Sequence, residues 1–170
     1  MHPAAYQFVL AAIPLAGLHP ASRVLEIGAR DVNGSVRPLF GPCTYVGLDI
    51  APGPGVGVIA DAGSWDPVAD IGYRGPVVFD TVVCCEVLEH ADNARAIVRN
   101  AFRLLTDGGL FIMTCAGDGR GPHSAVDGGP LRPGEFYHNV GTREFEEWAA
   151  PFSKTLMDTA GPDLRALCIK

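Results

Sequence analysis

Residues 23–34 constrain the fold of this chain more than any other part of the sequence. The stretch begins with the apolar residues Val24, Leu25 and Ile27, which suit a strand buried on both faces. It ends in a turn that contains Gly28, charged side chains and a short amide. A buried strand that runs into such a turn and then into a helix is where open α/β sheets bind small ligands. The stretch therefore predicts a ligand pocket at the end of the first strand.

The rest of the chain contains the strands that such a sheet requires. Six further segments have the composition of strands, at 44–49, 56–60, 77–85, 110–115, 154–159 and 164–169. Strands and helical segments alternate up to about residue 115, and the last two strands flank a Gly-Pro turn. Alternation favours parallel strands with helices on both faces. We therefore expect an α/β fold, namely a Rossmann-like, mostly parallel seven-stranded sheet with a C-terminal antiparallel hairpin.

Helical spacing predicts where the helices lie. An amphipathic stripe runs through residues 6–17, and it includes Val9 and Leu10. Asn33 or Ser35 is expected to cap a short helix. A clear helix starts at Asn93 and ends at the Asp-Gly-Gly turn of residues 107–109, while residues 63–75 leave room only for a short helix. Thr142 is expected to cap a final helix whose aromatic side chains face inward.

Composition limits the kind of protein that this chain can be. A length of 170 residues fits one domain, residues 1–170, with a substantial core. The formal charge of −6 argues against phosphate-based binding of nucleic acid. No apolar run reaches the length of a membrane span, and the N-terminus lacks the basic region of a signal peptide, so we expect a cytoplasmic protein without membrane partners. The five cysteines form no C-x-x-C pair and are expected to be buried, reduced thiols.

Acidic residues follow several of the predicted strands. Because parallel strands end at one edge of the sheet, Gly28, Asp49, Asp61 and Glu86 should converge on a shared crevice. Asp49 lies 21 residues after Gly28, about the spacing at which a carboxylate grips ribose hydroxyls. The turn has only the first glycine of the dinucleotide pattern G-x-G-x-x-G, and Asp31 adds negative charge. An NAD-dependent oxidoreductase is therefore less favoured than a protein that binds a different adenosine-containing cofactor.

Taken together, the motifs resemble those of the class I S-adenosylmethionine-dependent methyltransferases, in the small-molecule branch. Residues 24–28 resemble the first motif of that family, and residues 46–50 resemble its ribose-binding strand end. Residues 59–62 are similar to the segment that contacts adenine. Residues 79–90 and 104–110 are similar to its fourth strand and to its turn into the fifth. The similarity covers about residues 22–115 in the right order and spacing.

The resemblance implies how the first turn would hold the methionine portion of S-adenosylmethionine. Gly28 and Ala29 would supply backbone contacts, and Glu26 would organise the turn or bind through water. Arg30 stands where the family often has glycine. Its guanidinium could pair with the carboxylate of the cofactor, and Asn33 would belong to the same variant turn.

The resemblance also implies contacts to the adenosine. Asp49 would hold the ribose hydroxyls, and Ile50 would pack on the adenine. Asp61 would accept a hydrogen bond from the adenine amine, with the Ala62 amide nearby. The wall below the transferred methyl group would be formed by Cys85 and Glu86.

The expected reaction is in-line methyl transfer from S-adenosylmethionine to an O, N or C nucleophile on a small-molecule acceptor. The glycine-rich stretch 116–134 is a candidate lid over the pocket. Since no substrate domain is apparent, the lid alone would hold the acceptor, or a homo-oligomer or partner subunit would complete the site. The alternative is a methyltransferase-like fold that binds a cofactor or a partner without transferring methyl.

Histidines are the candidates for removing a proton from the acceptor. His138 is the candidate catalytic residue, because it lies beside the long loop and precedes the last predicted helix. For His123 the favoured interpretation is a surface loop residue. For His90 it is a residue that stabilises the turn before Asn93, since the sequence identifies no partner. No metal ligand set is evident in the sequence.

Overall fold

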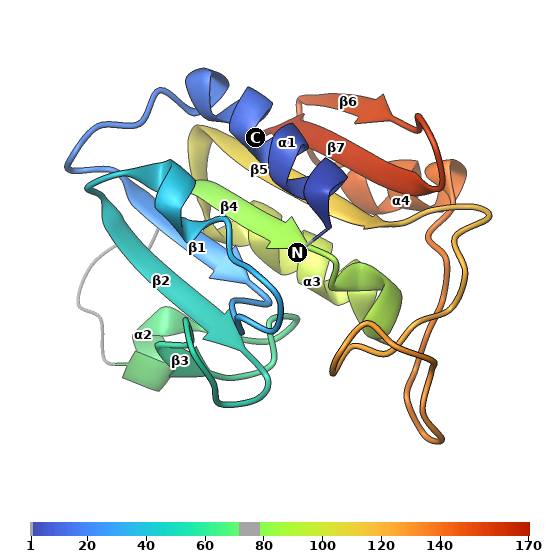
Figure 1. Ribbon diagram of the computed structural model, residues 1–170. Coiled ribbons are helices and arrows are strands. Elements are labelled where there is room, and N and C mark those ends of the chain that lie inside the picture. Colours follow the sequence, from blue (N-terminus) through green and yellow to red (C-terminus); the bar gives the residue numbers. More distant parts are fainter. Residues whose placement is uncertain (1, 72–78) are drawn as a thin grey trace.

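A seven-stranded sheet forms the centre of the molecule (Figure 1). The computed structural model describes residues 2–71 and 79–170. The strands lie in the order β3-β2-β1-β4-β5-β7-β6. Their bounds are β1 Arg23–Ile27, β2 Thr44–Asp49, β3 Val58–Ile59, β4 Phe79–Cys85, β5 Leu105–Ala116, β6 Lys154–Asp158 and β7 Asp163–Ile169.

The pairing of the strands confirms the expected fold class. Strands β3, β2, β1, β4 and β5 run parallel to one another, whereas β7 is antiparallel to both β5 and β6. In this register Ile27 pairs with Leu48 on one side and with Cys84 on the other. The residues that follow these three therefore emerge at one edge of the sheet, and this edge is where the site residues were predicted.

Helices cover both faces of the sheet (Figure 1). Helix α1 (Pro3–Ala12), the 3-10 turn η1 (Ile13–Ala16) and the 3-10 turn η2 (Arg37–Phe40) pack against one face. Helices α3 (Ala94–Leu104) and α4 (Thr142–Ala149) pack against the other. The remaining short elements are α2 (Pro67–Ile71) and the 3-10 turn η3 (Leu88–His90). No helix among the described residues is long and apolar enough to cross a membrane.

The N-terminal helix buries most of the stripe that its spacing predicts, since Val9 is fully buried and Tyr6 and Ile13 pack against the core. The predicted stripe includes Leu10, but this side chain is 45% exposed. The buried residues are Ala5, Val9 and Ala12. The α-helix ends at Ala12 and a 3-10 turn follows, which breaks the 3.6-residue period on which the longer stripe depended.

Several predicted boundaries shift by a few residues. Helix α4 begins after Gly141, so Thr142 is its first residue and not its cap. Turn η2 follows Val36 and has no side-chain cap, although the Ser35 hydroxyl accepts the N–H of Arg37. Strand β5 begins at Leu105, earlier than predicted, because Leu105 pairs with Phe79.

Other predictions are confirmed within the described residues. Phe145, Trp148 and Phe152 are buried beneath α4. All five cysteines are free, four of them buried and Cys43 half-buried. Residues 77 and 78 of the fourth predicted strand, and residues 72–75 of the predicted short helix, lie outside the described residues.

Asn100 ties helix α3 to the loop that carries one of the predicted site residues. Its amide nitrogen donates hydrogen bonds to the carbonyl oxygens of Ala62 and Trp65, at 2.8 and 3.0 Å. Its amide oxygen accepts the Nε–H of Arg103 at 2.8 Å. The side chain is 6% exposed, and its bond to Trp65 is buried. The buried amide of Asn100 therefore helps to hold the loop after β3 in place.

We predict that Asn100→Ala lowers the free energy of unfolding by about 2 kcal/mol, because the partly buried Ala62 carbonyl and the buried Trp65 carbonyl lose the hydrogen bonds that Asn100 supplies. Urea denaturation followed by circular dichroism measures the loss. Arg99→Ala on the exposed side of the same helix serves as the control and should change stability by less than about 0.5 kcal/mol. Equal losses in the two variants would show that the buried amide has no special role.

Candidate functional site

A cavity of about 990 Å³ opens at the edge where β1, β2 and β4 end. This volume is at the upper end of the range for pockets that hold small molecules and cofactors. The turn after β1, the ends of β2 and β4 and the segment after β3 form its floor and sides. Residues 120–128 of the long loop form a further wall. The cavity is therefore bounded by the sheet on one side and by the loop on the other.

The structure brings all the residues predicted to contact a cofactor to this one cavity. They come from four strand ends and from the turn after β1. The residues are Glu26, Gly28, Ala29, Arg30, Asn33, Asp49, Ile50, Asp61, Ala62, Cys85 and Glu86.

The turn after β1 is held against the end of β2 by its backbone. The N–H groups of Gly28 and Ala29 both donate to the Leu48 carbonyl oxygen, at 2.9 and 3.1 Å. Gly28 has φ = +76°, a conformation that residues with a side chain rarely adopt. A Cβ atom at this position would lie 2.1 Å from Cγ2 of Val87. Glycine is therefore favoured both by the backbone conformation and by the close approach of the Val87 side chain.

Two carboxylates of the cavity are oriented by hydrogen bonds. One oxygen of Asp49 accepts the N–H of Arg30 at 3.1 Å, and the other accepts the N–H of Ala51 at 2.9 Å. Asp61 accepts the N–H of Gly63 at 2.8 Å and the side-chain amide of Asn93 at 2.9 Å. The Gly63 and Asn93 bonds lower the pKa of Asp61. Since a carboxylate oxygen has two lone pairs, each aspartate keeps acceptor capacity for a ligand.

Ile50 and Arg30 border the cavity with exposed side chains. Ile50 is 78% exposed although it is apolar, which suits a surface that a flat apolar ring could cover. The side chain of Arg30 runs over Gly53, where a Cβ atom would lie 2.8 Å from its Cγ. The stem of Arg30 is thus placed against the turn after β2. Its pairing with a cofactor carboxylate remains a prediction.

Glu26 is a buried acid beneath the first turn. Its side chain is only 5% exposed, and this burial raises its pKa from 4.5 to about 7. The positive charge of Arg37 opposes the increase, and the negative charges of Asp31 and Asp49 add to it. The proton on Glu26 is therefore exchanged near neutral pH, at the floor of the cavity.

We predict that Glu26→Gln makes the ligand-free protein more stable at pH 8 than the wild type, but not at pH 4. Because the folded pKa lies above the unfolded one, the wild type loses stability as the pH rises from about 4.5 to about 7. The loss corresponds to about 3 kcal/mol at most, and the amide removes it. Urea denaturation across this pH range measures the difference. Glu146→Gln, the same change at an exposed position of α4, should show no such dependence, and a flat difference for Glu26→Gln would contradict the prediction.

A second group of polar side chains lies beside the cavity, where η3 meets the long loop. Glu89 is fully buried, and its Oε1 accepts the N–H of Ala116 at 3.1 Å. The rings of His90, His123 and Tyr137 contact one another edge to face, with centroids 4.9 to 5.4 Å apart. Burial raises the pKa of Glu89 and lowers that of His90 to about 4. His90 and His123 also line the cavity.

Sequence reasoning missed this grouping. It treated His90 as a turn residue because it identified no partner for it, and it treated His123 as a surface loop residue. The partner of each is the other ring, across 33 residues of chain that include the whole of α3 and β5. Nothing in the sequence other than the two histidines themselves indicated that they would meet.

The structure does not bring His138 into the cavity wall. Its ring is 51% exposed and its Nε2 lies 2.9 Å from a carboxylate oxygen of Glu144 on α4. Its backbone N–H donates to the Glu89 carbonyl oxygen at 2.8 Å. The residue therefore contributes to the site through its backbone, whereas its imidazole points to the α4 carboxylate.

The sheet order and the cavity at its strand ends define a Rossmann-like protein with a site for a small-molecule cofactor. Solved structures share this fold. The chain resembles the CurJ carbon methyltransferase with a TM-score of 0.68 and 16% identity, over 96% of this chain and 53% of that one. It thus spans about half the length of that protein.

Two other structures match over most of their own length. The 1,6-didemethyltoxoflavin-N1-methyltransferase of Burkholderia thailandensis, solved with 1,6-didemethyltoxoflavin and S-adenosylhomocysteine, has a TM-score of 0.65 and 17% identity, over 98% of this chain and 78% of that one. The YcgJ protein of Bacillus subtilis has a TM-score of 0.66 and 14% identity, over 99% of each chain. No curated protein sequence matches the chain.

The family model of the methyltransferase domain matches residues 25–111, just over half of the chain. The chain belongs to this family. Its family and its fold are those of the class I S-adenosylmethionine-dependent methyltransferases, as its motifs predicted.

Proposed function

We propose that this chain binds S-adenosylmethionine across the ends of β1, β2 and β4 and methylates a small molecule. The observation that carries the proposal is the convergence of the Gly28 turn, Asp49 and Asp61 on one cavity. The spacing of these residues in the sequence agrees with their place at one sheet edge. Both are what an adenosine cofactor with an amino-acid tail requires.

The adenosine would lie along the end of β2. Asp49 is already oriented by two backbone N–H groups, so its free lone pairs can accept the two ribose hydroxyls. Ile50 offers an exposed apolar side chain to one face of the adenine. Asp61 would accept a hydrogen bond from the adenine amine, and Ala62 would lie beside the ring.

The methionine tail would lie over the turn after β1, against Gly28 and Ala29. Glu26 and Glu86 would place carboxyl groups in the wall beside the tail, and Cys85, at the end of β4, lines the same cavity. Glu86 is held in a fixed orientation because Oγ1 of Thr114 donates to its Oε1 at 2.9 Å. Such a wall suits the ammonium group of the tail and the positive charge at its sulfur.

When bound, the cofactor supplies a methyl group on a positively charged sulfur. The protein would contribute mainly by holding the acceptor in line with that group and by excluding water. The acceptor would enter between the strand ends and residues 120–128, where His90, His123 and Arg120 line the cavity. We propose a small-molecule acceptor because the room beyond the adenosine site is enclosed by this single loop.

Calorimetry with S-adenosylmethionine, S-adenosylhomocysteine and NAD tests the proposed function. Binding of the first two and not of NAD is expected, followed by turnover with an acceptor that carries a hydroxyl, an amine or an activated carbon. Binding without turnover on any acceptor would favour the second candidate, a cofactor-binding protein without transfer activity. Binding of NAD alone would overturn both.

We predict that Asp49→Asn raises the Kd for S-adenosylhomocysteine about tenfold to a hundredfold. The amide keeps the shape of the side chain but replaces one acceptor oxygen by a donor, so hydrogen bonds to a charged group are lost, each worth about 1.5 to 3 kcal/mol. Calorimetry measures the change. The control is Asp107→Asn, the same substitution at an exposed position near the start of β5. An unchanged Kd for Asp49→Asn would show that this carboxylate does not hold the ribose.

We also predict that His138→Ala leaves turnover within about twofold of the wild type, since its imidazole pairs with Glu144 outside the cavity. The initial rate at saturating cofactor measures it. A large loss of kcat without a loss of stability would restore His138 as a catalytic residue.

A further inference from the structure

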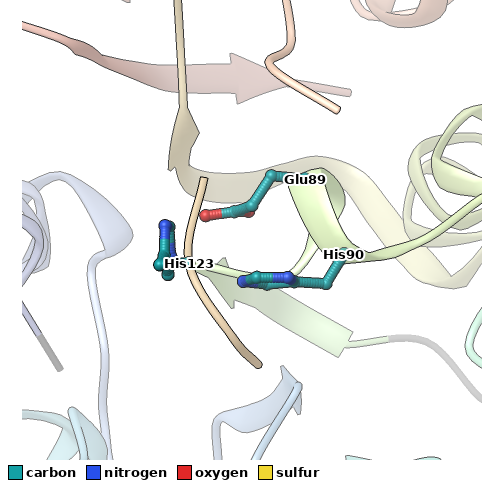
Figure 2. Close-up of side chains that lie close together, drawn as sticks. All are labelled: Glu89, His90 and His123. Carbon is teal, nitrogen blue, oxygen red and sulfur yellow. The ribbon is translucent and has the colours of Figure 1, made fainter. Parts of the chain in front are cut away.

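Glu89, His90 and His123 bring three potential metal ligands together at the wall of the cavity (Figure 2). Glu89 and His90 come from η3, and His123 comes from the long loop that faces it. One ligand atom from each residue lies within 4.8 Å of the other two. We propose that these three residues bind a divalent transition-metal ion, with zinc as the metal that suits them best.

The Glu89 carboxylate is the strongest sign of a ligand. The side chain is fully buried, and its Oε1 is satisfied by the N–H of Ala116. Its Oε2 has no hydrogen-bond partner among the described residues. A buried carboxylate oxygen without a donor is costly, and a cation beside it removes the cost. The bond to Ala116 fixes the carboxylate, as hydrogen bonds behind metal ligands commonly do.

Both histidines can present a free nitrogen to the same point. Nδ1 of His90 has no hydrogen-bond partner among the described residues. Nδ1 of His123 lies 3.2 Å from the carbonyl oxygen of Gly121. If that nitrogen carries the proton, Nε2 is left as a lone pair, which is the arrangement typical of a metal-bound histidine. Tyr137 packs against both rings and restricts their orientation.

The distances leave little movement to be made. Three atoms no more than 4.8 Å apart have a common centre within about 2.8 Å of each of them. Bonds from zinc to nitrogen or carboxylate oxygen are about 2.0 to 2.2 Å long. Each ligand atom therefore has to move by about 0.7 Å at most, which side-chain rotation and a small shift of the loop around His123 can provide.

Zinc fits the ligand set better than magnesium or calcium does. Two imidazoles and one carboxylate are typical ligands of zinc and of iron(II), whereas magnesium and calcium prefer sites made of oxygen. Arg120 is a cation in the same wall, but its guanidinium is paired with the Asp163 carboxylate. Because Glu89 lies behind the cavity surface while His90 and His123 line it, the open coordination positions of the ion would face the cavity.

Titration of the chelator-treated protein with zinc chloride, followed by calorimetry, tests the proposal without S-adenosylmethionine, so it stands or falls independently of the proposed function. One zinc per chain is expected for the wild type. His123→Ala should weaken binding at least tenfold, and since this residue lies on a surface loop the variant should stay folded. Glu89→Gln, which keeps the shape of the buried side chain, should weaken binding by a similar factor.

His19→Ala is the matched control, because His19 is exposed in a turn that does not line the cavity. Its zinc affinity should equal that of the wild type. Cobalt(II) added in place of zinc should give visible absorption bands that are lost in His123→Ala and kept in His19→Ala. The proposal is overturned if the wild type binds no stoichiometric metal, or if His19→Ala and His123→Ala weaken binding equally.

Discussion

One carbonyl oxygen, that of Leu48, accepts the two N–H groups that position the proposed cofactor site. The bonds from Gly28 and Ala29 tie the turn after β1 to the last residues of β2. This attachment places the next N–H, that of Arg30, against the Asp49 carboxylate. The turn, the strand end and the carboxylate thus form one unit, and it exists only because β1 and β2 are parallel and end in the same register.

Glu26 and Glu89 are two buried acids that lower the stability of the folded chain. Glu26 and Glu89 are both almost entirely shielded from water, and burial raises the pKa of each. Neither is needed by the hydrophobic core, which packs on both faces of the sheet through apolar side chains. Buried carboxyls that oppose stability in this way are characteristic of functional sites, where the charge is required by a ligand and not by the fold.

Most of the cofactor side could be predicted from the sequence, because it is encoded locally. Runs such as Val24–Ile27 identify buried parallel strands, and the first polar residue after each run marks the strand end. Parallel pairing then brings Gly28, Asp49 and Glu86 to one edge without further information. The stem of Arg30 could not be predicted, because it rests on Gly53, a contact that depends on the path of the turn after β2.

The proposed acceptor side could not be predicted, because it is set by a loop without periodicity. Residues 117–141 contain no helix or strand. Their path is fixed by isolated hydrogen bonds and not by the regular pairing of a helix or a sheet. The His138 N–H donates to the Glu89 carbonyl, and the Val140 N–H donates to that of Ala116. Within the loop, the Ser124 hydroxyl donates a hydrogen bond to the Glu135 carboxylate at 2.7 Å.

The two proposed halves of the site, for the cofactor and for the acceptor, are positioned by different parts of the fold. The residues that would hold the cofactor are positioned by the register of the sheet, whereas His123 is positioned by the backbone of the loop. Substitutions in the loop can therefore change what the cavity accepts while Gly28, Asp49 and Asp61 stay in place. The same loop residue that borders the acceptor space also completes the group of Glu89 and His90. A change of acceptor and a change of metal affinity would then be coupled through His123, and neither would need a change in the sheet.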